Sequence, residues 1–304
     1  MSLVGGASYD HLEFPINADT PPLATGQASR ELLAPKAALL FSPWERGLFR
    51  ASYTKSLSGL YFDNSVRLEP TQVGGFNQTF RSLIPESVAG LVPGTEFETV
   101  GVGFDQSLRS GSWFGVEAEW LTSDGKRNVG VLTNSIPFLS LPDFPGTTRQ
   151  DLDFRERNLS AYAGQLLGDN VSLGARYRLS EAELAERFPE IPNTAANLSL
   201  LESNARGLLQ QVSLTANFHH RCGVFAQWES AWYHQSNSGY TPVLAGEDFW
   251  QHNLAVGYRF PRRHAEVRFG LVNIFDTDYR LNPLNRHAEL SHVRLLTVSL
   301  RLNF

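Results

Sequence analysis

The chain has 304 residues, and it combines a formal net charge of −5 with a pI of about 5.9. This acidic balance leaves no basic surface for nucleic acid, and the single cysteine, Cys222, excludes a disulfide scaffold and a cysteine-based zinc site. Because no shift in composition marks a linker, we expect one domain over residues 1–304.

Alternating apolar and polar residues predict strands in the first half of the chain. The alternating segments are residues 3–14, 32–41, 48–56, 96–108 and 113–122. Phe49 and Arg50, for example, fall on opposite faces of a period-two pattern, which is typical of a strand. Residues 15–29 and 57–95 are predicted loops. The second loop is long for a compact soluble domain and fits the outer rim of a barrel.

The second half continues the pattern as far as the C-terminus. Strands are predicted at residues 154–167, 171–180, 208–218, 224–234, 250–260, 265–275 and 296–304. Loops are predicted at residues 133–149, 237–248 and 276–290. Residues 181–206 contain EAELAERF and NLSLLESNA, whose spacing predicts either short helices or a folded loop.

The lengths of the connections indicate how these strands are arranged. Short turns near residues 44, 110, 169, 221 and 262 alternate with long loops. Alternation alone fits both a soluble sandwich and a membrane barrel, but consistent sorting of turn lengths favours a barrel of the outer membrane. We therefore predict an all-β fold: an antiparallel, up-and-down transmembrane β-barrel. It would have about 12 strands, as a closed barrel or a segment of a larger one, with both termini at the short-turn, periplasmic end.

Several charged residues lie on the predicted polar faces of these strands. They are Glu117, Glu119, Arg176, Arg178, Arg268 and Arg301. Such a mixed lining tunes the selectivity of a pore. Two alternatives are solvated charge that only keeps a lumen wet, and paired carboxylates at Glu117 and Glu119 for acid–base catalysis.

Metal, cofactor and enzyme motifs are not predicted. His219, His220 and His234 have no acidic partner at a fixed spacing, and no nucleophile elbow or dinucleotide fingerprint is present. We therefore expect no catalytic residue, no metal site and no cofactor.

Residues 269–281, FGLVNIFDTDYRL, resemble the C-terminus of TonB-dependent outer-membrane receptors. The signature positions are Asn273, Phe275, Asp276 and Tyr279, and a strand ending in Phe304 follows. Upstream, the YDH and RASY segments are similar to strands of the same receptors. The segments EPTQVGGFNQTFRSLIPES, GEDFWQHNLAVGYRFPRRHAE and LNPLNRHAEL resemble a branch of receptor-like barrels associated with tetratricopeptide repeats.

This resemblance implies a location and partners. The location would be the outer membrane of a Gram-negative bacterium, and the function uptake of a small ligand such as a siderophore or another nutrient. The partners would be outer-membrane lipid, the ligand and the outer-membrane insertion machinery. That machinery would recognise the last strand through Phe304, Leu302 and Leu300.

The chain also departs from the receptor pattern. The receptors carry a plug domain and a TonB box before a barrel of about 22 strands, whereas here a predicted strand follows Met1 almost directly. We therefore expect a barrel domain without a plug, and no TonB coupling by this chain alone. The alternatives are a passive porin, an export pore of the repeat-plus-barrel kind, and a structural barrel.

Overall fold

Neighbouring strands of the main sheet pair antiparallel in the order in which they occur along the chain. The computed structural model describes residues 1–17, 20–57, 72–73, 76–77, 93–133, 144–192, 201–241, 243–279 and 293–302. Twelve strands form this sheet: β1 (Ser2–Asn17), β2 (Ala24–Phe41), β3 (Gly47–Leu57), β6 (Glu96–Ser107), β7 (Ser112–Thr133), β8 (Phe144–Leu167), β9 (Val171–Arg187), β10 (Ser203–His219), β11 (Val224–Ser238), β12 (Glu247–Arg259), β13 (Ala265–Val272) and β14 (Leu295–Leu302). The predicted up-and-down fold class is thus confirmed.

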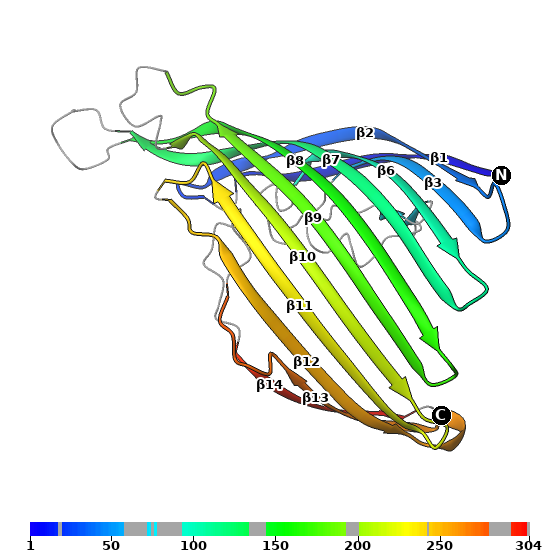
Figure 1. Cartoon of the computed structure of the whole chain (residues 1–304). Coiled ribbons are helices and arrows are strands. Elements are labelled where there is room, and N and C mark those ends of the chain that lie inside the picture. Colours follow the sequence, from blue (N-terminus) through cyan, green and yellow to red (C-terminus); the bar gives the residue numbers. More distant parts are fainter. Residues whose placement is uncertain are drawn as a thin grey trace.

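The sheet curves into a wall, with β1–β3 and β12–β14 on opposite sides of the arc (Figure 1). A separate two-stranded hairpin, β4 (Gln72–Val73) and β5 (Phe76–Asn77), lies on the concave side. We call the concave side the inner face and the convex side the outer face. The start of β1 and the end of β14 lie towards the short turns, as predicted. No helix among the described residues is long and apolar enough to cross a membrane.

The strands next to the long connections are longer than predicted. β2 begins at Ala24, and β8 begins at Phe144, so parts of the predicted loops 15–29 and 133–149 are strand. β9 continues to Arg187 and β10 begins at Ser203, so the prediction of helices or a loop is wrong for residues 181–187 and 203–206. This segment, EAELAER, also alternates with a period of two, and Ala182 is buried on the inner face. Residues 193–200 lie outside the described part of the chain.

An apolar band covers the outer face of the sheet. On β9 it consists of Val171, Leu173, Ala175, Tyr177 and Leu179. The side chains in this band are exposed or half-buried, and Leu173 (42%) and Val116 on β7 (45%) are among the exposed ones. A contiguous apolar surface of this kind marks an interface with a partner or a membrane. The stretch from Val171 to Leu179 also matches the roughly 9–11 residues that a membrane-spanning strand needs. The outer face therefore has the size and polarity to contact lipid.

Beyond the band, the polarity of the two faces is reversed. Arg206 of β10 forms ion pairs on the outer face with Glu181 and, at 3.7 Å, with Glu183. On the inner face of the same region, apolar side chains form a buried cluster of Leu121, Leu152, Phe154, Ala182, Leu184 and Ala205. Because charged side chains on a lipid-facing surface are costly, the edge of the band lies between Leu179 and Glu181 on β9. The strands continue past this edge as an extramembrane wall.

Aromatic rings lie near both edges of the band. At the short-turn edge, Trp44, Phe49 and Phe104 pack together, and the Phe49 and Phe104 ring centroids are 4.6 Å apart. At the other edge, Trp232 and Trp250 occupy paired positions on β11 and β12. These positions match the aromatic girdles of outer-membrane barrels.

The two terminal strands are the edges of the sheet. Within the described residues, β1 pairs with β2, β14 pairs with β13, and no pairing joins β1 to β14. The sequence predicted either a closed barrel or a segment of a larger one. Closure of the twelve strands on themselves is not observed in the described part of the chain. The described strands form an open arc.

Candidate functional site: a charged network on the inner wall

The register of the sheet gathers polar residues from neighbouring strands on the inner face. Residues paired across antiparallel strands point to the same side of a sheet. One row contains Arg50, Gly103, Glu117, Ser160, Arg178 and Gln211. The next row towards the short turns contains Asp105, Gly115, Tyr162, Arg176 and Ser213. These two rows form the candidate site.

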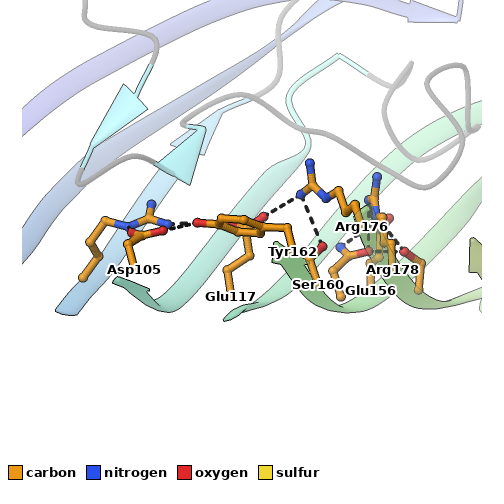
Figure 2. A network of polar contacts seen from close by, with 10 residues as sticks. Asp105, Glu117, Glu156, Ser160, Tyr162, Arg176 and Arg178 are labelled. Carbon is orange, nitrogen blue, oxygen red and sulfur yellow. Dashed lines mark hydrogen bonds and ion pairs between the residues drawn. The ribbon is translucent and has the colours of Figure 1, made fainter. Parts of the chain in front are cut away.

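Glu117 links two arginines in this network. Its Oε1 lies 2.8 Å from Nη2 of Arg176, and its Oε2 lies 3.5 Å from Nη2 of Arg50. Arg50 Nε also lies 2.7 Å from Oδ2 of Asp105. The other oxygen of this carboxylate, Oδ1, accepts a hydrogen bond from the Tyr162 hydroxyl. Figure 2 shows these side chains following one another along the wall from Asp105 to Arg176. Charged groups of both signs are therefore held in place across five strands, β3 and β6–β9.

Arg178 is held mainly by neutral groups. Its Nε donates to Ser180 Oγ at 3.0 Å, and its Nη2 donates to Asn158 Oδ1 at 3.1 Å. Its ion pair with the buried carboxylate of Glu156 is longer, with 4.0 Å between Nη2 and Oε1. Arg178 and Arg176 both rise from β9 into the space in front of the inner face (Figure 2).

A hollow of about 760 Å³ lies in front of this part of the wall. Its lining includes Arg176, Arg178, Trp113 and, two strands away from the arginines, Glu229. Gly164 and Gly174 face each other across β8 and β9. A Cβ atom at Gly164 would lie 2.1 Å from a ring atom of Trp113, so only glycine allows the indole to lie against the wall there.

Phe76 of β5 packs against the same wall. The Arg50 guanidinium carbon lies 5.0 Å from the centre of the Phe76 ring, which is within the range of a cation–π contact. The ring covers Gly101, where a Cβ atom would lie 2.4 Å from a ring carbon. Part of the connection predicted for the outer rim, residues 57–95, therefore lies on the inner face. Most of that connection is outside the described residues.

All six predicted lining residues lie on the inner face, but they do not form one group. Glu117 and Arg176 are bonded to each other, and Glu119 lies on β7 beside them. Arg268 and Arg301 lie on β13 and β14, at the far edge of the sheet: Arg301 is paired with Glu266, and Arg268 lies one row away. Glu266 itself pairs with Arg259 at 2.8 Å. The arrangement thus has two charged regions, one on β3–β9 and one on β12–β14.

The sequence did not single out Tyr162 or Asn158, and it did not predict that Arg50 binds Asp105. Tyr162 and Asn158 lie on β8, whose outward-facing Arg155 and Arg157 place charge on both faces and conceal the alternation. One signal in the sequence could have identified them. Residues 154–167 and the clearly alternating strand 171–180 are joined by a short turn and must therefore pair as a hairpin. That pairing places Tyr162 opposite Arg176.

The three His residues noted in the sequence do not converge on a site. His234 lies 3.1 Å from Asp248 on the outer face, and His219 and His220 lie at the β10–β11 turn. Among the described residues, there is no group of three or more His, Cys, Asp or Glu side chains placed to hold a metal ion.

The receptor-like signature forms a turn after β13. Asn273 is buried and has a positive φ of 54°. Its side chain bonds the backbone of Thr277 twice: Oδ1 accepts from the amide at 3.0 Å, and Nδ2 donates to the carbonyl at 2.9 Å. The Asn273 amide donates to Asn253 Oδ1 of β12 at 2.9 Å. This residue therefore fixes the turn and attaches it to the neighbouring strand.

The other signature residues extend the same arrangement. Asp276 Oδ1 accepts a hydrogen bond of 2.6 Å from the amide of Arg294, just before β14. The Tyr279 ring stacks on Phe249 of β12 with centroids 4.4 Å apart, whereas the exposed Phe275 ring meets His252 edge-on. The signature residues thus join β12, β13 and the approach to β14.

We expect Asn273→Gly to lower the free energy of unfolding by about 1–2 kcal/mol, because glycine tolerates the positive φ but loses both side-chain hydrogen bonds. Asn273→Asp should cost less, because the carboxylate still accepts the Thr277 amide. Urea unfolding of the folded protein in detergent would measure both variants. Unfolding of Asn273→Gly at the wild-type urea concentration would contradict this role.

Two of the predicted assembly residues, Leu300 and Leu302, are exposed on the outer face of β14. Phe304 lies outside the described residues.

No family model and no curated protein matches the chain. Three solved structures of the ferripyoverdine receptor FpvA are similar to it in fold. FpvA of Pseudomonas aeruginosa with heterologous pyoverdines has a TM-score of 0.51 and 11% identity, over 80% of this chain and 35% of the receptor. The outer-membrane receptor of P. aeruginosa bound to ferripyoverdine has a TM-score of 0.52 and 13% identity, over 89% and 41%. The FpvAI–pyocin S2 complex has a TM-score of 0.54 and 11% identity, over 89% and 40%.

These matches confirm the predicted fold, an outer-membrane β-barrel sheet of the kind found in TonB-dependent receptors of Gram-negative bacteria. The chain spans between 35% and 41% of the length of these receptors. The narrower resemblance to barrels associated with tetratricopeptide repeats finds no support in the comparisons.

Proposed function

We propose that residues 1–304 form a single barrel domain, a transport wall of the outer membrane whose inner face lines an aqueous path for a small polar ligand. The opposite polarity of the two faces of the same strands carries this proposal. On β9, Leu173 and Tyr177 face outwards, while Arg176 and Arg178 face inwards. The side chains of these arginines are 51% and 38% exposed, and charge of this kind requires water or a polar ligand beside it.

The receptor-like fold and the signature turn support ligand uptake as the direction of transport. The bound ligand named for FpvA, ferripyoverdine, suggests that a siderophore or another small nutrient is a suitable candidate here. The outer apolar band would contact outer-membrane lipid. Leu300, Leu302 and Phe304 would present the last strand to the insertion machinery during assembly. The charged lining formed by Glu117, Glu119, Arg176, Arg178, Arg268 and Arg301 would set the selectivity of the path.

Passage of a neutral sugar tests the proposal. The protein would be reconstituted into liposomes and also produced in cells that lack other routes for the sugar, and uptake would be compared with protein-free controls. Uptake in liposomes would indicate a passive path, and uptake only in energised cells would indicate a coupled receptor. Absence of uptake from both would contradict transport and leave a structural barrel.

A further inference from the structure

We infer that the hollow beside β9 is a binding site for an oxyanion, a carboxylate or phosphate group of the transported ligand, with Arg178 and Arg176 as its anchors. This inference rests on the proposed transport function and specifies the class of ligand. Four observations carry it: the exposure of the two arginines, their spacing, the polar groups paired with them on β10, and the size of the hollow.

The arginines of the network differ in how far their side chains are enclosed. Arg50 is 12% exposed, binds the carboxylates of Asp105 and Glu117, and is covered by Phe76. Arg176 shares Glu117 with Arg50, and Arg178 contacts Ser180 and Asn158 more closely than the carboxylate of Glu156. The guanidinium groups of Arg176 (51% exposed) and Arg178 (38% exposed) are therefore open to an anion in the hollow, which would compete with Glu117 and Glu156 for them.

The spacing of the two arginines suits one small anion. They lie two residues apart on one strand, so their Cα atoms are separated by roughly 7 Å and their side chains point to the same face. Long, flexible arginine side chains can converge from that separation. A planar guanidinium also binds carboxylate and phosphate oxygens in a two-bonded geometry.

The neighbouring strands β10 and β11 complete the site. Gln211 and Ser213 of β10 pair with Arg178 and Arg176 across the strands and add neutral hydrogen-bonding groups. Glu229 of β11 lies one strand further on and would repel a second anionic group. It would instead accept a hydrogen bond from a hydroxyl or amine of the ligand. The volume of about 760 Å³ lies within the range of roughly 300–1,000 Å³ that is common for small-molecule sites.

Binding of simple anions to the folded full chain in detergent tests this inference. Inorganic phosphate, acetate and the neutral solute glycerol would be titrated at low ionic strength, and the dissociation constants measured by calorimetry. We expect phosphate, acetate or both to bind and glycerol not to bind. Binding of phosphate alone would identify a phosphate-bearing ligand, and binding of acetate alone a carboxylate-bearing one. If neither anion binds, the inference is wrong.

Three variants locate the site. Arg178→Gln should weaken anion binding by roughly tenfold or more, because a charge-assisted hydrogen bond is lost, and Arg178→Lys should weaken it less. Arg155→Gln is the matched control: Arg155 faces outwards beyond the apolar band, pairs with Asp153 at 3.1 Å, and its loss should leave binding unchanged. Equal losses in Arg178→Gln and Arg155→Gln would show non-specific attraction and overturn the inference.

Uptake of the neutral sugar by the same variants separates the two proposals. If the sugar passes and anion binding does not depend on Arg178, the oxyanion site is wrong and the transport function stands. If the sugar passes in neither liposomes nor cells, the transport function itself fails. Heat-modifiable migration on gels would confirm that each variant is folded.

Discussion

Phe154→Ala is expected to lower the free energy of unfolding by about 3–5 kcal/mol, the usual cost of removing a fully buried phenylalanine from a packed cluster. Phe154 has no exposed surface and packs with Leu121, Leu152 and Leu184 on the inner face beyond the apolar band. This cluster is the apolar core of the extramembrane wall. Its loss should open that part of the sheet first.

Urea unfolding in detergent, followed by tryptophan fluorescence, would measure this effect. Leu132→Ala is a suitable control, because Leu132 lies on β7 in the same extramembrane region but is 55% exposed. Its replacement should change the stability by less than about 1 kcal/mol. If the two variants unfold at the same urea concentration, the cluster does not stabilise the wall.

Leu214→Arg is expected to destabilise the folded protein in lipid by about 2–4 kcal/mol, the cost of a charged side chain near the middle of the bilayer. Leu214 faces outwards on β10, paired with Ala175, the central residue of the band on β9. Thr215→Arg places the same side chain one residue away, on the inner face beside the hollow. We expect this second change to be nearly neutral for folding.

Reversible unfolding from lipid vesicles would compare the two arginine variants directly. Vesicles are required because detergent can reorganise around a misplaced charge. A similar cost at both positions would argue against one lipid-facing and one water-facing side.

The sequence predicted the strands and their two faces in the part of the sheet that carries the apolar band. Val171–Leu179 alternates clearly because lipid and water impose opposite requirements on successive residues. Beyond the band, water is present on the outside, and the sheet places Ala182 and Leu184 inside and Glu181 and Glu183 outside. The pattern still has a period of two. The apolar residues of EAELAER are also spaced as in a helix, and the sequence therefore does not predict the end of β9.

The site was predicted less completely than the fold. Alternation placed Arg50, Glu117 and Arg176 on polar faces, but their contacts depend on the register between strands that are up to 126 positions apart in the chain, from Arg50 to Arg176. The contact of Phe76 with Arg50 depends on how a long connection folds back, and no periodic pattern encodes that path.

The central claim is that one face of these strands meets water and the other meets lipid, and cysteine labelling tests it most directly. The single native cysteine would first be removed by Cys222→Ser. In this background, Ser213→Cys would place a thiol on the inner face of β10, and Leu214→Cys would place one on the outer face at the next residue. Outer membranes containing each variant would be treated with a charged, membrane-impermeant maleimide and, separately, with a lipid-soluble one. We predict that the charged reagent labels residue 213 much faster than residue 214, and that the lipid-soluble reagent reduces or reverses this difference. Equal labelling of both positions by the charged reagent, or faster labelling at residue 214, would contradict the account.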